Sequence, residues 1–243
     1  LYTGDYEADE ENIELFHEAL DSYARGIPVQ YITGEAEFMG FDFDVNPSVL
    51  IPRPETEILV ERSLALIERE GMAEPFILDL GTGSGAIAVS LTKLSPSCKI
   101  IASDVSEEAL EVGRENAAGN GVSDRIEFIL SDFFERIPEK EKFDLVISNP
   151  PYIPSEDYDS LPPEVRSEPR IALDGGLKGL EFYKKIIPDA AKRLNRGGYL
   201  VLEIGYGQAQ AINDLLGSAG SYRDIEILKD YNDIDRIVFA KRR

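Results

Sequence analysis

A short apolar run that ends in a glycine-rich loop is the feature of this sequence that most limits the possible folds. Phe76 to Leu80 (FILDL) leads directly into Gly81-Thr82-Gly83-Ser84-Gly85, and a helical pattern follows over residues 86–91. An apolar run of this length is typical of a strand buried on both faces of a parallel sheet. Glycines at such a turn let a nucleotide-like ligand approach the backbone closely. The segment therefore predicts a strand, a ligand-binding loop and a helix of an α/β sheet.

The spacing of the glycines favours one cofactor over another. The loop reads G-x-G-x-G, without the third glycine of the dinucleotide fingerprint, and an acid, Asp79, stands two residues before Gly81. S-adenosylmethionine has no pyrophosphate, and its α-amino group needs an acid or carbonyl oxygens as acceptors. Both departures favour S-adenosylmethionine over a nicotinamide cofactor. We predict cofactor contacts from these residues: Asp79, Gly81, Thr82, Gly83, Ser84 and Gly85.

Two later predicted strands end in residues that suit the same cofactor. Residues 99–104 end in Asp104, the position from which an acid binds ribose hydroxyls in nucleotide-binding sheets. After residues 126–130 come Asp132 and Phe133, which suit the adenine amino group and the adenine ring. A solvated aspartate at a strand end is the alternative for Asp104, and core packing is the alternative for one of Phe133 and its neighbour Phe134.

A four-residue motif after another apolar run has the chemistry needed to methylate a planar NH2 group. Residues 143–148 lead into Asn149-Pro150-Pro151-Tyr152. The Asn149 side-chain carbonyl can accept one N–H and the Pro150 carbonyl the other, which leaves the nitrogen lone pair directed at the incoming methyl group. The prolines stiffen the turn, and Tyr152 supplies a flat face. We predict that Asn149, Pro150 and Tyr152 are catalytic; an ordinary strand exit is the alternative.

Three further segments extend these motifs into a family resemblance. They are Pro28 to Phe38 (PVQYITGEAEF), Ile51 to Glu57 (IPRPETE) and Glu168 to Gly176 (EPRIALDGG). Together with the glycine loop and the Asn149 motif, they closely resemble the release-factor glutamine methyltransferases, a family of class I S-adenosylmethionine-dependent enzymes. The resemblance runs from about Pro28 to Gln208 and more loosely to the C-terminus.

The resemblance implies methylation of a protein side chain in translation termination. The expected substrate and partner is a peptide chain release factor, methylated at N5 of the glutamine in its Gly-Gly-Gln motif, with S-adenosyl-L-homocysteine as the second product. Asn149 is expected to contact both cofactor and substrate, and Asn149, Pro150, Pro151 and Tyr152 to hold the glutamine amide. Relatives often carry Trp where this chain has Phe133, which keeps the stacking face but lacks the indole N–H.

The element pattern and the resemblance together predict the architecture. We expect a doubly wound, seven-stranded, mostly parallel sheet of the Rossmann-like class I methyltransferase type. Its last strand, by the resemblance alone, is antiparallel and inserted between its neighbours. Three parts are expected: the last helix of a largely missing N-terminal helical domain (1–25), a β-hairpin linker (26–51, with the hairpin over 30–45), and the methyltransferase domain (52–243).

The N-terminal helix presents an apolar stripe that needs a partner, formed by Ile13, Phe16, Leu20 and Tyr23. The missing domain is one candidate. The alternative is a natural short form in which the stripe docks on the catalytic domain.

Charge and composition limit the class of partner. The chain has 46 acidic residues against 25 Lys and Arg, a formal net charge of −21 at pH 7. Nucleic-acid-binding proteins usually carry basic patches that contact phosphates, so we expect a protein partner and no direct nucleic-acid binding. One histidine, His17, argues against a histidine-based metal site, and no metal is expected. With one cysteine and no long apolar span or signal peptide in the sequence, we expect a cytoplasmic monomer without membrane contact.

Several roles and functions stay open. The proline-locked residues 52–54 either close over the cofactor, with Phe38 as a wall of the glutamine pocket, or fix the linker through an Arg53–Glu55 pair. Acids and arginines in the long loop after Tyr152 either bind the partner or fold the loop; they are Glu164, Glu168 and Arg170. Other candidate functions are methylation of an exocyclic amine of RNA or DNA, methylation of another protein glutamine, nicotinamide-dependent oxidation, and cofactor binding without turnover in an adaptor.

Overall fold

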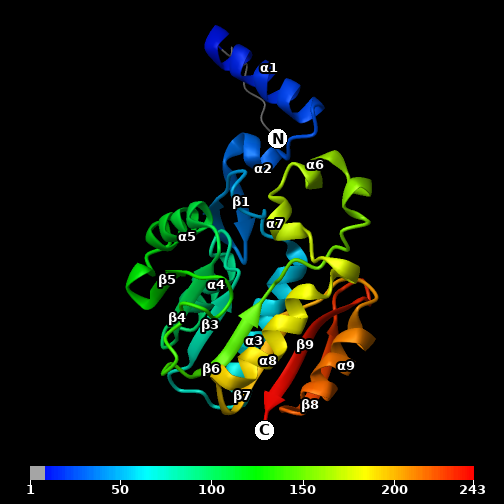
Figure 1. The fold of residues 1–243 in the computed structure, drawn as a ribbon. Helices are drawn as coiled ribbons and strands as arrows, with labels where there is room; N and C mark the ends of the chain where they lie inside the picture. The colour runs from blue at the N-terminus through cyan, green and yellow to red at the C-terminus, as the bar shows by residue number, and fades with distance from the viewer. Residues whose placement is uncertain (1–8) are drawn as a thin grey trace.

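A seven-stranded sheet with helices on both faces forms the body of the molecule (Figure 1). The computed structural model describes residues 9–243; residues 1–8, the start of the predicted N-terminal segment, lie outside the described part. The strand order is β5-β4-β3-β6-β7-β9-β8. The strands are β3 (Phe76–Leu80), β4 (Lys99–Asp104), β5 (Ile126–Leu130), β6 (Phe143–Ser148), β7 (Leu194–Glu203), β8 (Tyr222–Lys229) and β9 (Asp235–Arg242).

The last strand is the antiparallel member of the sheet. β9 lies between β7 and β8 and pairs antiparallel with both, whereas the pairs from β5 to β7 are parallel. The predicted fold class, including the inserted last strand, is therefore confirmed.

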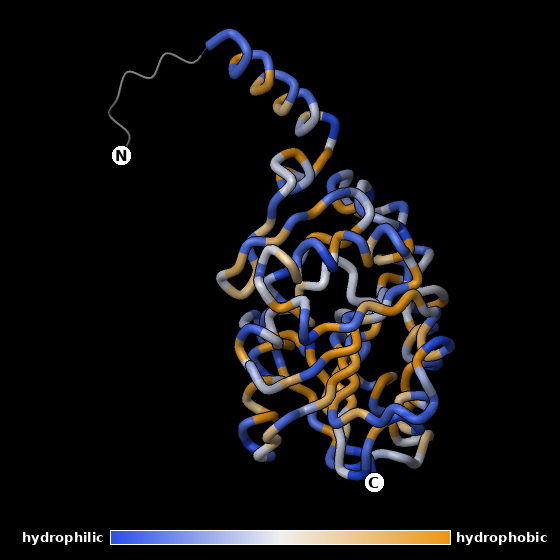
Figure 2. Tube along the Cα trace, turned by 90° about the vertical axis from the view of Figure 1, so that its left-hand side faces the viewer, coloured by the Kyte–Doolittle hydropathy of each residue, from blue (hydrophilic) through white to orange (hydrophobic). Residues whose placement is uncertain are grey.

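The helices cover the two faces because the central strands are apolar on both sides. Side chains alternate across a strand, so Ile77 packs in the cluster under α3 and α4 while Leu78 packs in the cluster under α8. Figure 2 shows the hydrophobic residues concentrated along the strands inside the body. The helices on the first face are α3 (Pro54–Arg69), α4 (Ala86–Leu94) and α5 (Glu107–Gly119); those on the second are α8 (Glu181–Arg193) and α9 (Ala209–Ala219).

A short helix and a hairpin connect the N-terminal helix to the body. The elements are α2 (Val29–Thr33), β1 (Glu35–Phe38) and β2 (Phe41–Asp44). The hairpin is shorter than the predicted 30–45, because Pro28 starts a helical turn that Gly34 ends with a left-handed φ of 80°. Asn116 of α5 holds the hairpin by two hydrogen bonds: it accepts from the Asp44 N–H at 2.7 Å and donates to the Asp44 carbonyl at 2.9 Å.

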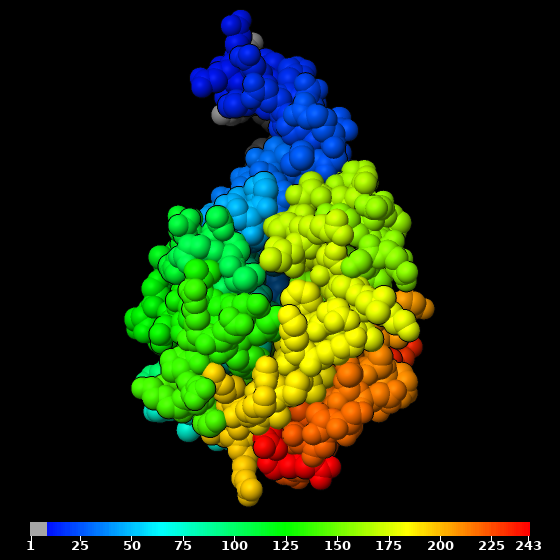
Figure 3. Space-filling model, in the orientation of Figure 1, coloured from blue at the N-terminus to red at the C-terminus, as the bar shows by residue number. Residues whose placement is uncertain are grey.

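Helix α1 (Glu10–Ala24) projects away from the body (Figures 1 and 3). Asp9 caps its first turn by accepting the Asn12 N–H at 2.8 Å, and none of its residues is buried. The predicted apolar stripe is exposed along its length, from 45% at Ile13 to 61% at Phe16. The alternative in which this stripe docks on the body of the molecule is therefore wrong. No helix within residues 9–243 is long and apolar enough to cross a bilayer.

The chain between β6 and α8 forms a compact segment with little regular structure. It contains two short helices, α6 (Pro163–Arg166) and α7 (Arg170–Leu173). The segment closes on itself where the Gly175 N–H donates to the Ile153 carbonyl at 2.8 Å and the Ile153 N–H donates to the Leu173 carbonyl at 3.0 Å. The closure places α7 beside the C-terminal ends of the parallel strands, where ligands bind in sheets of this type.

Candidate functional site

A cavity lies at the C-terminal ends of β3, β4, β5 and β6. Its empty space, with the open mouth included, is about 820 Å³. In Figure 3 it is the hollow between the green residues near α5 and the yellow-green segment that follows β6. Eight of the predicted site residues line it: Gly81, Gly83, Asp104, Asp132, Phe133, Asn149, Pro150 and Pro151. The other predicted residues lie behind this lining or outside it.

The three glycines of the loop have two different roles. All three adopt a left-handed φ, of 71° at Gly81, 54° at Gly83 and 79° at Gly85, which disfavours any other residue. A Cβ atom at Gly81 or Gly83 would meet no protein atom within 4 Å, whereas one at Gly85 would lie 3.2 Å from the Gly113 Cα of α5. Gly81 and Gly83 thus leave space in the cavity, and Gly85 lets α4 pack closely against α5.

Asp79 lies buried behind the glycine loop. Its Oδ2 accepts from the Thr82 hydroxyl at 2.6 Å, and burial raises the pKa of its carboxyl group to about 7. Within residues 9–243, its Oδ1 has no hydrogen-bond partner. An unpaired buried carboxylate oxygen beside an open loop suits a cationic group such as the α-amino group of S-adenosylmethionine. Thr82 and Ser84 are also buried and do not line the cavity.

Asp104 fastens the glycine loop to the end of β4. Its Oδ2 accepts from the Gly83 N–H at 2.9 Å and its Oδ1 from the Ser106 N–H at 3.1 Å. Burial raises the pKa of this carboxyl group. Each carboxylate oxygen keeps a lone pair beyond the bond it makes, so Asp104 has acceptors left for ribose hydroxyls.

Phe133 presents an aromatic face to the cavity from an unusual backbone conformation. Its φ is 47°, in the left-handed region, and the Ser131 hydroxyl donates to its carbonyl at 3.0 Å. Its ring lies 5.5 Å from the Phe182 ring, centroid to centroid, and the Lys185 Nζ lies 5.0 Å from its centroid. Phe182 of α8 thereby holds the ring in place beside Asp132, where an adenine ring could stack.

The Asn149 motif is tied to two residues that sequence reasoning missed. The Asn149 Nδ2 donates to the Thr56 hydroxyl oxygen at 3.0 Å, and the Thr56 hydroxyl donates to Glu203 Oε2 at 2.7 Å. The Tyr152 hydroxyl donates to Glu203 Oε1 at 3.3 Å. Thr56 belongs to the segment IPRPETE, whose role was open, and Glu203 is an acid at the end of an apolar strand, which is the signal that could have singled it out.

Two predicted substrate contacts do not line the cavity. The Phe38 side chain is 1% exposed and packs edge-on against Phe43, with ring centroids 6.0 Å apart, in the cluster under α3 and α4. Its place is a packing position in the core, because the hairpin turns its ring inward, and the predicted pocket wall is not seen. Tyr152 lies behind the prolines, where its ring packs against the cluster under α8.

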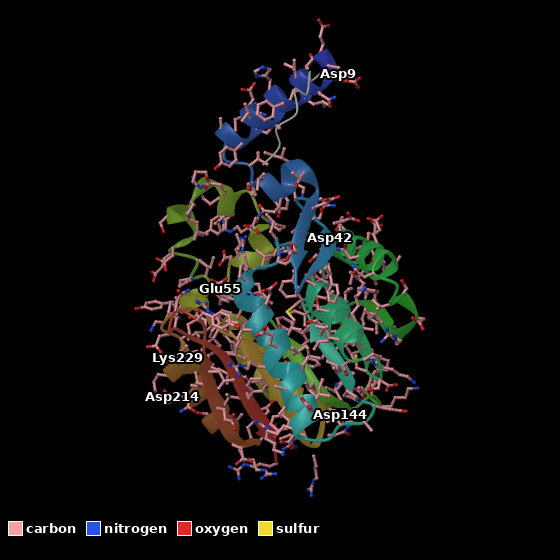
Figure 4. The ribbon with its side chains drawn as sticks, turned by 180° about the vertical axis from the view of Figure 1, so that it is seen from behind. Asp9, Asp42, Glu55, Asp144, Asp214 and Lys229 are labelled. Atoms are coloured by element: carbon pink, nitrogen blue, oxygen red, sulfur yellow. The ribbon has the colours of Figure 1, made fainter. Side chains whose placement is uncertain are left out.

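The proline-locked segment before α3 is held by an acid from the distant loop. Arg53 pairs with Glu168, and the Glu168 Oε2 also accepts from the Ile51 N–H at 3.1 Å. The alternative of an Arg53–Glu55 pair is therefore wrong; Glu55 lies at the start of α3, as labelled in Figure 4. Glu168 is buried and folds the loop against this segment, and Arg170 pairs with Asp174 within the loop.

Comparison with known proteins places the chain among methyltransferases. Residues 74–217 match a family model described as "Methyltransferase domain". The release factor glutamine methyltransferase of Moorella thermoacetica is 47% identical over 229 residues, which are 94% of this chain and 80% of that protein. Those of Chlorobaculum tepidum and Aquifex aeolicus are 42% and 40% identical, over 92% and 97% of this chain and 78% and 82% of theirs.

Solved structures share the fold at lower sequence identity. The ribosomal protein L11 methylase of Lactobacillus delbrueckii subsp. bulgaricus superposes with a TM-score of 0.58 and 22% identity, over 82% of this chain and 84% of that one. An RNA methyltransferase of Salinibacter ruber in complex with S-adenosyl-L-homocysteine superposes with a TM-score of 0.51 and 17% identity, over 79% of this chain and 93% of that one. At these identities the similarity concerns the fold.

Proposed function

The chain belongs to the release factor glutamine methyltransferase family, and we propose that it methylates N5 of the glutamine in the Gly-Gly-Gln motif of a peptide chain release factor. The methyl donor is S-adenosylmethionine. The observation that carries the proposal is the arrangement at the end of β6. Asn149 and Pro150 line the same cavity as Gly81 and Gly83, so an amide held by the motif lies next to a cofactor held by the loop.

The residues around the cavity divide between cofactor and substrate. We assign the cofactor to Gly81, Gly83, Asp104 and Phe133. Its α-amino group is assigned to the side of the loop where Asp79 Oδ1 has no hydrogen-bond partner among residues 9–243. The glutamine amide is assigned to Asn149 and the Pro150 carbonyl. When bound, S-adenosylmethionine supplies an electrophilic methyl group on a sulfonium centre.

Orientation of the amide is the main contribution of this chain to the reaction. An amide nitrogen is a poor nucleophile because its lone pair is delocalised. Asn149 Oδ1 and the Pro150 carbonyl, each accepting one N–H, direct the lone pair out of the amide plane toward the methyl group. The same two oxygens stabilise the positive charge that develops on nitrogen during transfer. The amide N–H becomes acidic as the methyl group arrives, so a strong base is unnecessary.

The negative charge of the chain supports a protein partner. A formal net charge of −21 disfavours contacts with nucleic-acid phosphates and favours a partner with a basic surface, which it would attract at low salt. We infer that the protein acts as a monomer on release factors in the cytoplasm. We also infer that residues 52–243 form the catalytic domain, which the family match over residues 74–217 supports, with α1 and the hairpin preceding it.

The test is methyl transfer from labelled S-adenosylmethionine to separate substrates: release factor, its Gln→Ala variant, tRNA and DNA. We expect label on the release factor and none on the other three. Label that persists on the Gln→Ala variant would contradict the assigned target, and label on tRNA or DNA would favour the nucleic-acid alternative.

Substitution of the motif tests the assigned residue. Asn149→Ala should lower the rate by about 10²-fold or more, as removal of one positioned polar group does elsewhere. Asn195→Ala is the matched control, because Asn195 lies at the start of β7 and bonds to Asp144, which Figure 4 labels at the opposite end of the sheet. An unchanged rate in Asn149→Ala would refute the role assigned to this side chain.

A further inference from the structure

A buried network of hydrogen bonds connects the methylation motif to the first turn of α3 and to the C-terminal end of the neighbouring strand β7. It runs from Asn149 through Thr56 of α3 to Glu203 of β7 and returns through Tyr152. Thr56 is 5% exposed and Glu203 is 0% exposed, so bulk solvent does not reach either side chain. The Glu203 carboxyl group is therefore bonded directly to Tyr152 and, through the Thr56 hydroxyl, to Asn149.

We propose that Thr56 and Glu203 are positioning residues that hold the Asn149 side chain with its carbonyl oxygen toward the glutamine amide. The inference rests on the proposed methylation of an amide. It adds two residues that contact neither substrate nor cofactor and act through Asn149 and Tyr152.

The number of donor hydrogens among these hydrogen-bonded side chains decides the orientation of Asn149. Ionised Glu203 can only accept, so the single hydroxyl hydrogen of Thr56 is donated to Oε2. The Thr56 oxygen then has only lone pairs left for Asn149, which must present its NH2 group. None of the hydrogen bonds of residues 9–243 uses Asn149 Oδ1, and Asn149 lines the cavity. The oxygen is thus free for the substrate.

The second branch of the chain restrains Tyr152. Its hydroxyl donates to Glu203 Oε1, and its backbone carbonyl accepts from Gln208 Nε2 at 2.9 Å. Burial and the Glu203 charge raise the pKa of the Tyr152 hydroxyl, so it stays a donor at neutral pH. Hydrogen bonds therefore restrain Tyr152 at its hydroxyl group and at its backbone carbonyl. Tyr152 directly follows the two prolines, and the Pro150 carbonyl is the second acceptor assigned to the glutamine amide.

The burial of Glu203 lowers the stability of the fold, so its presence at this position points to a role in the site. A buried carboxylate without a cationic partner destabilises a protein, and an apolar residue would continue the strand. Among residues 9–243 Glu203 forms no ion pair; the nearby Arg236 bonds to Asp230 and to the Ile204 carbonyl. Strongly perturbed acids of this kind concentrate at functional sites.

The groups that face Glu203 set its protonation near neutral pH. Burial raises the pKa of Glu203 to about 7, and the negative charge of Glu55 of α3 raises it further. The hydrogen bonds from Thr56 and Tyr152 and the positive charge of Arg236 of β9 lower this pKa but do not offset the effect of burial. Tyr183 of α8 also faces it and donates to its backbone carbonyl at 2.9 Å. A protonated Glu203 can donate to Thr56, which can then donate to Asn149. The amide would turn its oxygen away from the cavity, so the proposal requires the ionised form.

The first test removes one hydroxyl and keeps the shape of the side chain. Thr56→Val should lower kcat about 10- to 100-fold, the loss seen when groups that orient metal ligands are removed, with the KM for release factor and the affinity for S-adenosyl-L-homocysteine changed less than threefold. Thr56→Ser, which restores the hydroxyl, should recover most of kcat. Thr92→Val is the matched control: Thr92 is a buried threonine of α4 whose hydroxyl donates to the Ala88 carbonyl at 2.7 Å.

The second test is the pH profile of kcat. In the wild-type enzyme kcat should fall as the pH drops below about 7, and in Glu203→Gln, which cannot titrate, kcat should be lower and lack this acid limb. The pH profile is measured at saturating S-adenosylmethionine, whose α-amino group would keep Asp79, the other acid with a pKa near 7, ionised. The proposal is overturned if Thr56→Val keeps the kcat of Thr92→Val, or if Glu203→Gln keeps the acid limb of the wild type. Either result is distinct from failure of the proposed function, which would show as absence of methyl transfer to release factor by the wild-type enzyme.

Discussion

Substitution of single glycines in the loop should separate ligand binding from helix packing. Gly83→Ala and Gly85→Ala place the same methyl group two residues apart, both at a left-handed φ. At Gly83 the new Cβ enters open space at the cavity, and at Gly85 it is pressed against the backbone of α5. We therefore expect Gly85→Ala to lose more stability than Gly83→Ala, and Gly83→Ala to lose more cofactor affinity than Gly85→Ala.

The stability losses follow from the two surroundings. A left-handed backbone costs an L-residue about 1–2 kcal/mol, which applies to both variants. The Gly85 Cβ would lie 3.2 Å from the Gly113 Cα and 3.4 Å from the Gly113 carbonyl oxygen, both backbone atoms that cannot rotate away. Overpacking of this kind adds about 1–3 kcal/mol. We expect a loss of about 2–5 kcal/mol in unfolding free energy for Gly85→Ala and about 1–2 kcal/mol for Gly83→Ala.

Urea unfolding and calorimetric titration with S-adenosyl-L-homocysteine measure the two effects. In Gly83→Ala the methyl group occupies ligand space, so the affinity should fall at least about tenfold, equivalent to about 1.4 kcal/mol. In Gly85→Ala, studied below its unfolding transition, the affinity should fall less than about threefold. Equal losses of stability in both variants, or a larger affinity loss at Gly85, would refute the division of roles.

Three further outcomes are expected. Glu168→Ala should lower the unfolding free energy by about 2–3 kcal/mol in urea, less than for a fully buried pair because Arg53 is 32% exposed; a loss below 1 kcal/mol would contradict the fastening role. Phe133→Ala should weaken the binding of S-adenosyl-L-homocysteine about three- to tenfold, because the stacking contact is lost. Equal affinities of the wild type and Phe133→Ala would disprove this. Burial raises the pKa of Glu203 from 4.5 to about 7, so the folded state binds this proton more tightly than the unfolded state does. Lowering the pH from 8 to 5.5 should therefore stabilise the wild type relative to Glu203→Gln, by at most about 1.4 kcal/mol per pH unit. Urea midpoints that change with pH by the same amount in the two proteins would contradict this.

Features encoded over short stretches of chain were predictable. The strand and glycine loop at Phe76 to Gly85 form as expected, because an apolar run and positive-φ glycines act within a few residues of one another. The Asn149 motif lies at the end of a parallel strand for the same reason. The inserted position of β9 came from the resemblance, since periodicity carries no information on strand order.

Contacts between distant segments were not predictable in this way. Glu203 is 147 residues from Thr56, and Thr56 is 93 residues from Asn149. They meet because β7 lies next to β6 and α3 packs against β7. Phe38 was assigned to the glutamine pocket, yet the hairpin turns its ring into the core.

The amino-acid sequence by itself determined the strand and glycine loop at Phe76 to Gly85, the position of the Asn149 motif after a strand, and the class of sheet, because each depends on residue types at fixed local spacing. Only the tertiary structure decided that Gly85 lies against the backbone of α5, that Arg53 pairs with Glu168, and that Thr56 links Asn149 to the buried Glu203. These depend on which strands and helices become neighbours and on how few hydrogens a buried chain of polar groups has to share.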